Sequence, residues 1–250
     1  MSAEPPGWPP GVGLVILDET GSTNDEARLR AEAGEPGPLW IMARRQVSGR
    51  GRGGRAWGEA QGNLYATLLL RPEGGATEAS LLSFAACLAI AEIFESAGGR
   101  AALKWPNDAL LNGGKAAGVL LEGSGRGAAM DWLAIGCGVN LVSHPPAAPE
   151  AAHPPTDLLA ETGRRLEPEA ALAILAASLE RWRLRLAAEG FAPLRDAWLA
   201  RAARLGQPIE ARLPRESVKG LFEDVDAEGA LVLRTAAGLR RIHAADIYFP

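Results

Sequence analysis

Short apolar runs and longer stretches with one apolar face divide the chain into predicted strands and helices. Residues 80–97 have the length and the apolar face of a helix, and Gly98-Gly99 end it. Other helices are expected from Thr23 to near Gly34, over residues 168–189 and over about 193–204. The predicted strands cover about residues 12–17, 39–43, 63–71, 101–105, 108–112, 115–122 and 130–137.

From Gly206 onward the pattern changes to short strands separated by turns. This part is predicted to be a small β-barrel-like module of about 45 residues, too small to be robust alone. Residues 1–11 are rich in Pro and Gly and predict a disordered lead, and residues 143–157 form a Pro-rich loop whose length marks it as functional or mobile. We therefore expect a lead at 1–11, a main domain at 12–204 and a C-terminal module at 205–250.

Composition and charge exclude several classes of protein. The net charge of the 250 residues is only -4, which disfavours a strongly basic nucleic-acid binder as a description of the whole chain. The two cysteines, Cys87 and Cys137, cannot build a disulfide framework and lie in apolar runs typical of a core. No uninterrupted apolar run reaches about 18 residues, so no bilayer span is expected. The first cation is Arg28, so the N-terminus lacks the charged head of a signal peptide, and the cytoplasm is the expected compartment.

The strongest local signal is a loop that alternates arginine with glycine at residues 49–57. Glycines let a backbone approach a ligand closely and expose its N–H groups. The loop fits G-x-G-x-x-G, but it runs into a strand rather than a helix, which disfavours a dinucleotide fold. An RNA-binding tail is disfavoured because the segment occurs once and lies between two strands, and a solvated loop is the plainest alternative. An anion-binding loop is the preferred interpretation because five cations fall within twelve residues without an acid: Arg44, Arg45, Arg50, Arg52 and Arg55.

A second group of signals surrounds two of the chain's three lysines. Lys104 begins Lys-Trp-Pro-Asn-Asp, which ends a strand because the residue before proline is pushed to an extended backbone. One interpretation is a core tryptophan followed by a turn, and the other places Lys104 and Asp108 near phosphates, with Asp108 able to hold Mg²⁺. Lys115 follows a hairpin signal and could be an exposed edge-strand lysine. Gly118, inside an apolar strand, indicates that another group approaches the backbone.

Other candidate residues are weaker signals. Ser22-Thr23-Asn24 are preferred helix N-cap residues, and Thr23 and Glu26 have the spacing of a capping box. Capping is compatible with ligand binding, because a helix N-terminus presents free N–H groups. The segment from Gly136 to Asn140 is Gly-x-Gly at a strand end, which is weak evidence alone. The three histidines show neither metal-ligand spacing nor pairing with a nucleophile.

Taken in order, these segments resemble the biotin–protein ligase (holo-carboxylase synthetase) family over about residues 12–142. The resemblance implies an α/β (α+β) fold: a mixed sheet flanked by helices, related to class II aminoacyl-tRNA synthetases, followed by an SH3-like β-barrel. It implies that biotin and ATP give biotinyl-5′-AMP with Mg²⁺, and that biotin then passes to a lysine of a biotin carboxyl carrier protein. A monomer or homodimer is expected. Only about eleven residues precede the first strand, so neither a DNA-binding domain nor repressor function is expected.

The resemblance also implies roles for individual residues. Arg50, Arg52 and Lys115 are the expected catalytic residues, and Asp108 the expected Mg²⁺ ligand. The expected biotin-binding residues are Ser22, Thr23, Asn24, Gln46, Arg50, Gly51, Arg52, Lys115 and Gly118. The expected ATP-binding residues are Arg50, Arg52, Arg55, Trp57, Lys104, Asn107, Asp108 and Asn140. Two alternatives stay open, a lipoate–protein ligase and a nonenzymatic protein that binds anions or RNA.

Overall fold

A mixed sheet of seven strands forms the centre of the protein. The computed structural model describes residues 5–126, 129–147 and 153–249. The strand order is β1-β2-β3-β7-β6-β5-β4, in which β1 and β2 are parallel and the other neighbours antiparallel. The strands are β1 (Gly13–Thr20), β2 (Leu39–Gln46), β3 (Leu64–Leu70), β4 (Ala101–Lys104), β5 (Asp108–Leu111), β6 (Gly114–Arg126) and β7 (Ala129–Val139).

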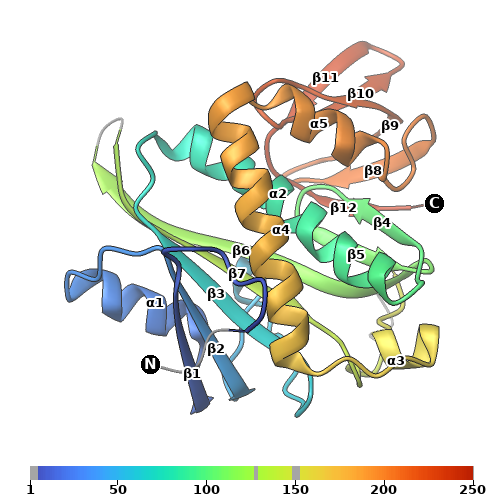
Figure 1. Ribbon diagram of the computed structural model, residues 1–250. Coiled ribbons are helices and arrows are strands. Elements are labelled where there is room, and N and C mark those ends of the chain that lie inside the picture. The colour runs from blue at the N-terminus through green and yellow to red at the C-terminus, as the bar shows by residue number, and fades with distance from the viewer. Residues whose placement is uncertain (1–4, 127–128, 148–152, 250) are drawn as a thin grey trace.

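Helices cover both faces of this sheet (Figure 1). α2 (Ala76–Ser96) packs on β4 to β7, and α4 (Pro168–Glu189) packs on α2. α1 (Thr23–Glu32) contacts β2, β3 and β7 from the other face, called here the α1 face. The remaining helices are α3 (Leu158–Thr162) and α5 (Ala192–Leu199). The expected mixed sheet flanked by helices is confirmed.

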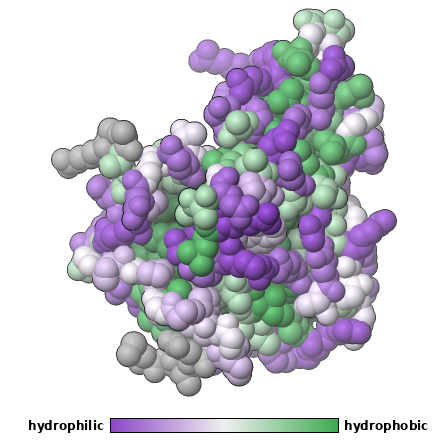
Figure 2. Space-filling view, turned by 45° about the horizontal axis from the view of Figure 1, so that its top comes forward, coloured by the Kyte–Doolittle hydropathy of each residue, from purple (hydrophilic) through white to green (hydrophobic). Residues whose placement is uncertain are grey.

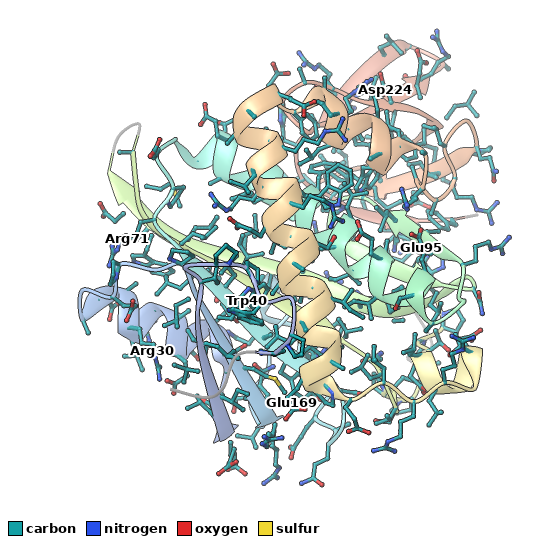
Figure 3. All side chains as sticks on the ribbon, in the orientation of Figure 1. Arg30, Trp40, Arg71, Glu95, Glu169 and Asp224 are labelled. Carbon is teal, nitrogen blue, oxygen red and sulfur yellow. The ribbon has the colours of Figure 1, made fainter. Side chains whose placement is uncertain are left out.

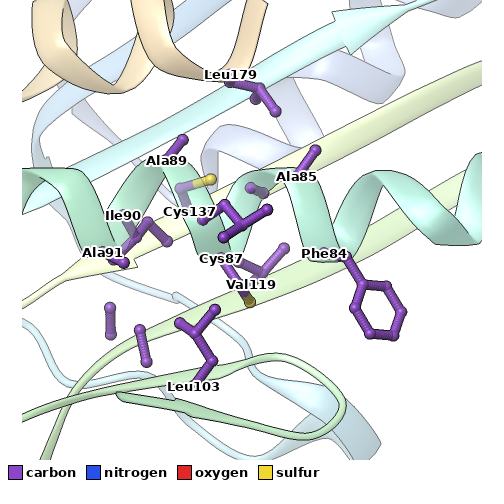
Figure 4. Close-up of a cluster of buried hydrophobic side chains, with 14 of the residues drawn as sticks. Phe84, Ala85, Cys87, Ala89, Ile90, Ala91, Leu103, Val119, Cys137 and Leu179 are labelled. Atoms are coloured by element: carbon purple, nitrogen blue, oxygen red, sulfur yellow. The ribbon is translucent and has the colours of Figure 1, made fainter. Parts of the chain in front are cut away.

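Strand alternation sends neighbouring side chains to different cores. Along β2, Trp40 and Met42 join the large cluster under α2 and α4, whereas Leu39 and Ile41 join a smaller cluster with Ala27 of α1. This follows from the two-residue period of a strand, and it explains why β2 is apolar at consecutive positions. Figure 4 shows part of the larger cluster, with Cys87 and Ile90 of α2, Val119 of β6 and Cys137 of β7 gathered together, while the Phe84 ring points away from them.

The C-terminal part is a five-stranded antiparallel sheet in the order β11-β10-β9-β8-β12. It packs on the main domain through an aromatic cluster in which Trp198 of α5 lies 5.3 Å from Phe84 and 6.4 Å from Phe222, ring centre to ring centre. The Trp105 indole also donates a hydrogen bond to the Gly229 carbonyl, at 3.0 Å. The strands are β8 (Pro208–Arg212), β9 (Ser217–Val225), β10 (Leu231–Thr235), β11 (Gly238–Ile242) and β12 (Asp246–Tyr248).

Charged side chains tie the elements together at the surface. Arg71 donates hydrogen bonds to the carbonyls of Ala31, Glu35 and Asp131, which fastens the end of α1 to β7. Arg195 of α5 pairs with Asp224 of β9. Arg71 and Asp224 are labelled in Figure 3 and lie at opposite sides of the molecule in that view. On the face seen in Figure 2, hydrophilic and hydrophobic residues are interspersed.

Several expectations about where elements begin and end are wrong: the helix predicted to reach about residue 204 ends at Leu199, and β6 continues to Arg126 rather than to residue 122. The described part of the lead, residues 5–11, is packed rather than disordered: Trp8 is buried in the main core and its indole donates to the Val12 carbonyl. Residues 1–4 lie outside the described residues. β2 also extends three residues beyond the predicted 39–43, because Arg45 pairs in register with Glu19 of β1 and forms an ion pair with it.

Helix α2 is the one described helix that is long and apolar enough to cross a membrane. Its apolar window is 78% buried inside the protein, as expected of a core helix, so this is weak evidence for a span.

Candidate active site

A cavity of about 500 Å³ lies on the α1 face of the sheet, between the main domain and the C-terminal sheet. Its wall comes from the N-terminus of α1, the loop at residues 49–57, the β4–β5 turn and parts of β6, β7 and β12. Every candidate site residue singled out from the sequence lines this cavity: Ser22, Thr23, Asn24, Gln46, Arg50, Gly51, Arg52, Arg55, Trp57, Lys104, Asn107, Asp108, Lys115, Gly118 and Asn140. The fold therefore brings together segments that lie more than 100 residues apart in the chain.

A buried polar network fixes the N-terminus of α1 in this wall. The Gln46 side-chain oxygen accepts a hydrogen bond from the Thr23 backbone N–H at 2.9 Å. Thr67 of β3 donates to the Asn24 side-chain oxygen at 2.7 Å and lies 2.8 Å from the Thr23 hydroxyl. These groups are all less than 10% exposed, so their polar atoms need each other as partners. The network holds Thr23, Asn24 and Gln46 in defined orientations.

The predicted capping box at Thr23 and Glu26 is wrong. Ser22 is the N-cap residue of α1, and its side chain makes no capping hydrogen bond. Glu26 instead accepts from the Thr20 hydroxyl and pairs with Arg30. Gln46 from β2 accepts from the N–H of Thr23, the first helical residue, which satisfies one of the free N–H groups at the helix start. The Ser22 hydroxyl is thus not used for capping, and Ser22 lines the cavity.

Arg50 is held by carboxylates from two other elements. Its guanidinium makes a two-pronged pair with Asp25 of α1, at 2.7 and 2.8 Å, and lies 3.7 Å from Glu122 of β6. Glu122 also accepts from the Asn24 amide at 2.8 Å. The hydrogen bond from Arg50 lowers the pKa of Asp25 below its usual range, so the pair stays charged near neutral pH. Arg50 is therefore tied to the same network as Asn24.

Lys115 and Asp108 form an ion pair inside the cavity, with 2.7 Å between Nζ and Oδ1. The Lys115 ammonium also lies 5.7 Å from the ring centre of Trp57, which favours a cation. β6 runs between β5 and β7, so the alternative of an exposed edge-strand lysine is wrong. Because Lys115 also lines the cavity, its ammonium can contact an anionic ligand there while it stays paired with Asp108.

Lys104 is the most buried cation of the cavity, with 8% of the residue exposed. Among the described residues no carboxylate lies within ion-pair distance of its ammonium, although the Phe249 ring lies 5.6 Å away. Burial lowers the pKa of Lys104 to about 8, with Asp108 opposing the shift and Lys115 adding to it. A buried ammonium facing a cavity is stabilised by an anionic ligand.

Asn107 and Asn140 serve as anchors for the cavity wall. The Asn107 amide donates to the Val119 carbonyl, which ties the β4–β5 turn to β6. The Asn140 amide donates to the Thr156 carbonyl at 3.0 Å and so holds the end of the Pro-rich loop. Residues 148–152 of that loop lie outside the described residues. Each amide nitrogen makes one hydrogen bond within the protein, which fixes these two side chains in the wall.

Glycines on β6 and β7 give the cavity its floor. A Cβ atom at Gly118 would lie 3.1 Å from the Trp57 ring, and one at Gly138 would lie 2.6 Å from the Trp57 indole nitrogen. One at Gly136 would lie 2.3 Å from the Asn24 side chain. The close approach expected at Gly118 is confirmed, and the approaching group is Trp57. The glycines leave room for Trp57 to lie flat over the two strands.

Replacing Gly138 with alanine is expected to destabilise the fold by about 1–3 kcal/mol, because the new methyl group forces Trp57 aside. Urea unfolding measures this difference. Gly21 is a matched control, since a Cβ there meets nothing within 4 Å, and G21A should differ little from wild type. A G138A protein as stable as G21A would contradict the expected clash.

Sequence reasoning missed several residues of the site. Thr67 is a single polar residue in an apolar strand, and that contrast was the available signal. Asp246 and Tyr248 enter the cavity wall from β12, and His153 enters from the Pro-rich loop. Burial lowers the pKa of His153 to about 4, so this imidazole is neutral at pH 7. No local pattern pointed to these three residues, since their partners lie far away in the chain.

The charges that line the cavity favour an anionic ligand. The described lining residues include five cations, Arg50, Arg52, Arg55, Lys104 and Lys115, against two carboxylates, Asp108 and Asp246. The loop that carries three of the arginines leads into β3, with only a short turn at Arg52–Gly54, which confirms that no helix follows the glycines. The site is built for a ligand with several negative charges.

Known proteins resemble this chain along nearly its whole length. Residues 17–140 match the sequence model of the biotin/lipoate A/B protein ligase family, and residues 205–249 match that of the biotin protein ligase C-terminal domain. The chain is 49% identical to a biotin–[acetyl-CoA-carboxylase] ligase of Paracoccus denitrificans, over 94% of this chain and 99% of the relative.

Solved structures show the same fold. A biotin protein ligase of Aquifex aeolicus, in complex with biotin and ATP, aligns with a TM-score of 0.82 at 24% identity, covering 95% of this chain and 99% of the other. A biotin protein ligase of Leishmania major, in complex with biotinyl-5-AMP, aligns with a TM-score of 0.57 at 27% identity, covering 94% of this chain and 100% of the other. Since nearly the whole sequence matches a ligase of this kind at 49% identity, the chain belongs to the biotin–protein ligase family.

Proposed function

We propose that this protein activates biotin with ATP and transfers the biotinyl group to a lysine of a biotin carboxyl carrier domain, as in acetyl-CoA carboxylase. The observation that carries the proposal is the convergence of five cations and a neutral polar pocket in one cavity. Membership of the biotin–protein ligase family supports it. The reaction consumes ATP and acts on a carboxylase subunit, and both point to the cytoplasm as its place.

The chemistry needs charge neutralisation more than an enzyme nucleophile. In the first step a biotin carboxylate oxygen attacks the α-phosphorus of ATP, and the bond to pyrophosphate breaks. Two unit charges 4 Å apart repel by about 4 kcal/mol at an effective dielectric of 20. Fixed cations remove that barrier, and holding both substrates in one cavity supplies the proximity. In the second step the acceptor amine attacks the biotinyl carbonyl, AMP leaves, and the amine loses a proton.

The neutral half of the cavity suits the biotin ring system. Ser22 offers a hydroxyl not used for capping, and Thr23, Asn24 and Gln46 are oriented by their mutual hydrogen bonds. Gly51 and Gly118 leave space for the ligand beside the arginine–glycine loop and β6. Rigid polar groups of this kind recognise a ligand without reorganising.

The charged half suits the carboxylate and the nucleotide. Arg50, Arg52 and Lys115 would neutralise the biotin carboxylate and the phosphoryl group it attacks, since arginine suits forked phosphate contacts and lysine a point contact. Arg55 and Lys104 would contact the remaining phosphates, with Trp57 packing beside them. Asn107 and Asn140 would act by holding the wall in place.

Asp108 fits a magnesium ion only together with the nucleotide. Among the described residues no three His, Cys, Asp or Glu side chains gather closely enough to hold a metal. Mg²⁺ often takes one carboxylate and completes its shell with phosphate oxygens and water, and Asp108 offers one carboxylate beside Lys115. Bound there, Mg²⁺ would neutralise phosphate charge.

To test this proposal, purified protein is incubated with ATP and either biotin or lipoate. Pyrophosphate release and labelling of a biotin carboxyl carrier domain are then measured. Pyrophosphate release and labelling that depend on biotin are expected. Release with lipoate alone would favour the lipoate ligase alternative, and salt-sensitive nucleic-acid binding without release would favour the nonenzymatic one.

The affinity for ATP is expected to fall above pH 8. The pKa of Lys104 is about 8 in the empty protein, so the ammonium is charged below that pH and loses its proton as the pH rises through it. ATP binding should then weaken by at most about tenfold per pH unit, as one proton is taken up with the ligand. Titrations between pH 7 and 9.5 measure this. K104R keeps its charge and should flatten the profile, and an equally steep profile in K104R would contradict the assignment.

A further inference from the structure

The last strand of the C-terminal sheet places a carboxylate among the cations of the cavity. Asp246, the first residue of β12, lines the cavity together with Ile247 and Tyr248. One of its oxygens, Oδ1, accepts hydrogen bonds from Arg52 Nη2 at 2.7 Å and from Arg55 Nη2 at 3.0 Å. Arg52 Nη2 also donates to the Ala245 carbonyl at 2.8 Å. The arginine–glycine loop is thus fastened to a strand about 190 residues further along the chain.

This contact has the chemistry of arginine holding a phosphate oxygen. Two guanidinium groups converge on one anionic oxygen, the arrangement by which arginines bind phosphate and carboxylate ligands. Burial raises the pKa of Asp246, but the hydrogen bonds from Arg55 and Arg52 outweigh it, so the pKa lies below its usual range. Asp246 is therefore a full negative charge in a cavity built for negative ligands.

The contact of Asp246 with Arg52 and Arg55 differs from the ion pair that Arg50 of the same loop makes with Asp25. Arg50 is matched by Asp25 through two hydrogen bonds, and Asp25 does not line the cavity. Asp246 lines it. The exposed fractions do not separate the pairs, at 42% for Asp246 and 29% for Arg52 against 39% for Asp25 and 34% for Arg50, so the difference lies in which carboxylate faces the cavity. An incoming anion can reach the Asp246 contacts, whereas the Arg50–Asp25 pair can persist with the ligand bound.

We propose that Asp246 takes the place of a nucleotide oxygen on Arg52 and Arg55 while the site is empty, and that ATP must displace it. The inference rests on the proposed function in one respect, that ATP is the anion that binds here. Asp246 is a positioning residue: it acts through Arg52 and Arg55. The C-terminal sheet thereby sets the affinity for the nucleotide and keeps the loop close to the cavity before the ligand arrives.

The test compares ATP binding by wild type and D246N in the absence of biotin. Removing the competing charge is expected to tighten ATP binding about three- to tenfold. This is the effect expected from losing two partly exposed ion pairs, those of Asp246 with Arg52 and with Arg55. The difference in ATP affinity between D246N and wild type should become smaller in high salt, because salt screens the competing charge. In the empty D246N protein, trypsin should also cleave faster after Arg52 and Arg55, because the loop is released from β12.

Two variants serve as controls. D246E keeps the charge and should keep an affinity near that of wild type. E216Q removes a carboxylate just before β9 that pairs with Arg240 outside the cavity. D246S replaces D246N if thermal unfolding shows that the amide disturbs the fold. Equal or weaker ATP binding by the neutral variant, or no binding by any protein, would overturn the inference. The proposed function fails separately, if wild type binds ATP but labels no acceptor.

Discussion

Replacing Lys115 with alanine is expected to lower kcat/KM for biotinyl-adenylate formation by more than about tenfold. The change removes a charge-assisted contact worth about 1.5–3 kcal/mol. It also leaves Asp108, which pairs with Lys115 at 2.7 Å, as an uncompensated negative charge facing the substrates. Biotin-dependent pyrophosphate release measures the effect.

The matched control is Lys219, an exposed lysine of β9, since K219A removes the same charge outside the cavity. Wild-type rates are expected for K219A. The double variant K115A/D108N separates the two causes when biotin binding is measured without ATP and Mg²⁺, because it removes the stranded carboxylate along with the ammonium while Asp108 has no metal to hold. A partial recovery relative to K115A would show that unpaired Asp108 contributes, and wild-type kinetics in K115A itself would reject the catalytic assignment.

Replacing Trp198 with alanine is expected to destabilise the protein by about 3–5 kcal/mol. Trp198 is 1% exposed and lies between Phe84 of α2 and Phe222 of β9, so its loss opens a cavity where the C-terminal sheet meets the main domain. The midpoint and slope of urea unfolding, followed by far-ultraviolet circular dichroism, measure the loss.

Phenylalanine at the same position provides the control. Among the described groups, the Trp198 indole N–H is buried without a hydrogen-bond partner. W198F keeps most of the ring and removes that unsatisfied donor, so it should cost much less than alanine. If W198F were as damaging as W198A, ring packing would not be the source of the stability.

Local pattern was sufficient for most elements of the fold. The apolar face and the Gly98-Gly99 stop predicted a helix at 80–97, and α2 spans Ala76–Ser96. The long helix at 168–189 agrees with α4 at both ends. These two helices could be predicted because their hydrophobic period and their stop signals lie within or directly beside the element itself. Every candidate site residue also lines the cavity, since each belongs to a short motif with its own chemistry.

The errors share one physical cause, a partner distant in sequence. Trp8 lies in a Pro/Gly-rich segment that looked disordered, yet it finds a place in the main core. The first N–H group of α1 finds its acceptor in Gln46, which lies 23 residues beyond Thr23. The alternative of an exposed edge-strand lysine at Lys115 fails for the same reason, because the backbone of Lys115 is bridged by Pro155, 40 residues further along the chain.

By itself the sequence determined the element types, the motifs that carry charge and the family they resemble, because these depend on residues close together in the chain. Tertiary structure alone decided which charges meet. It paired Arg50 with Asp25, Lys115 with Asp108, and Arg52 with Asp246 from the far end of the chain. An ion pair depends on distance in space, and that distance is set by the order of strands and the docking of the C-terminal sheet.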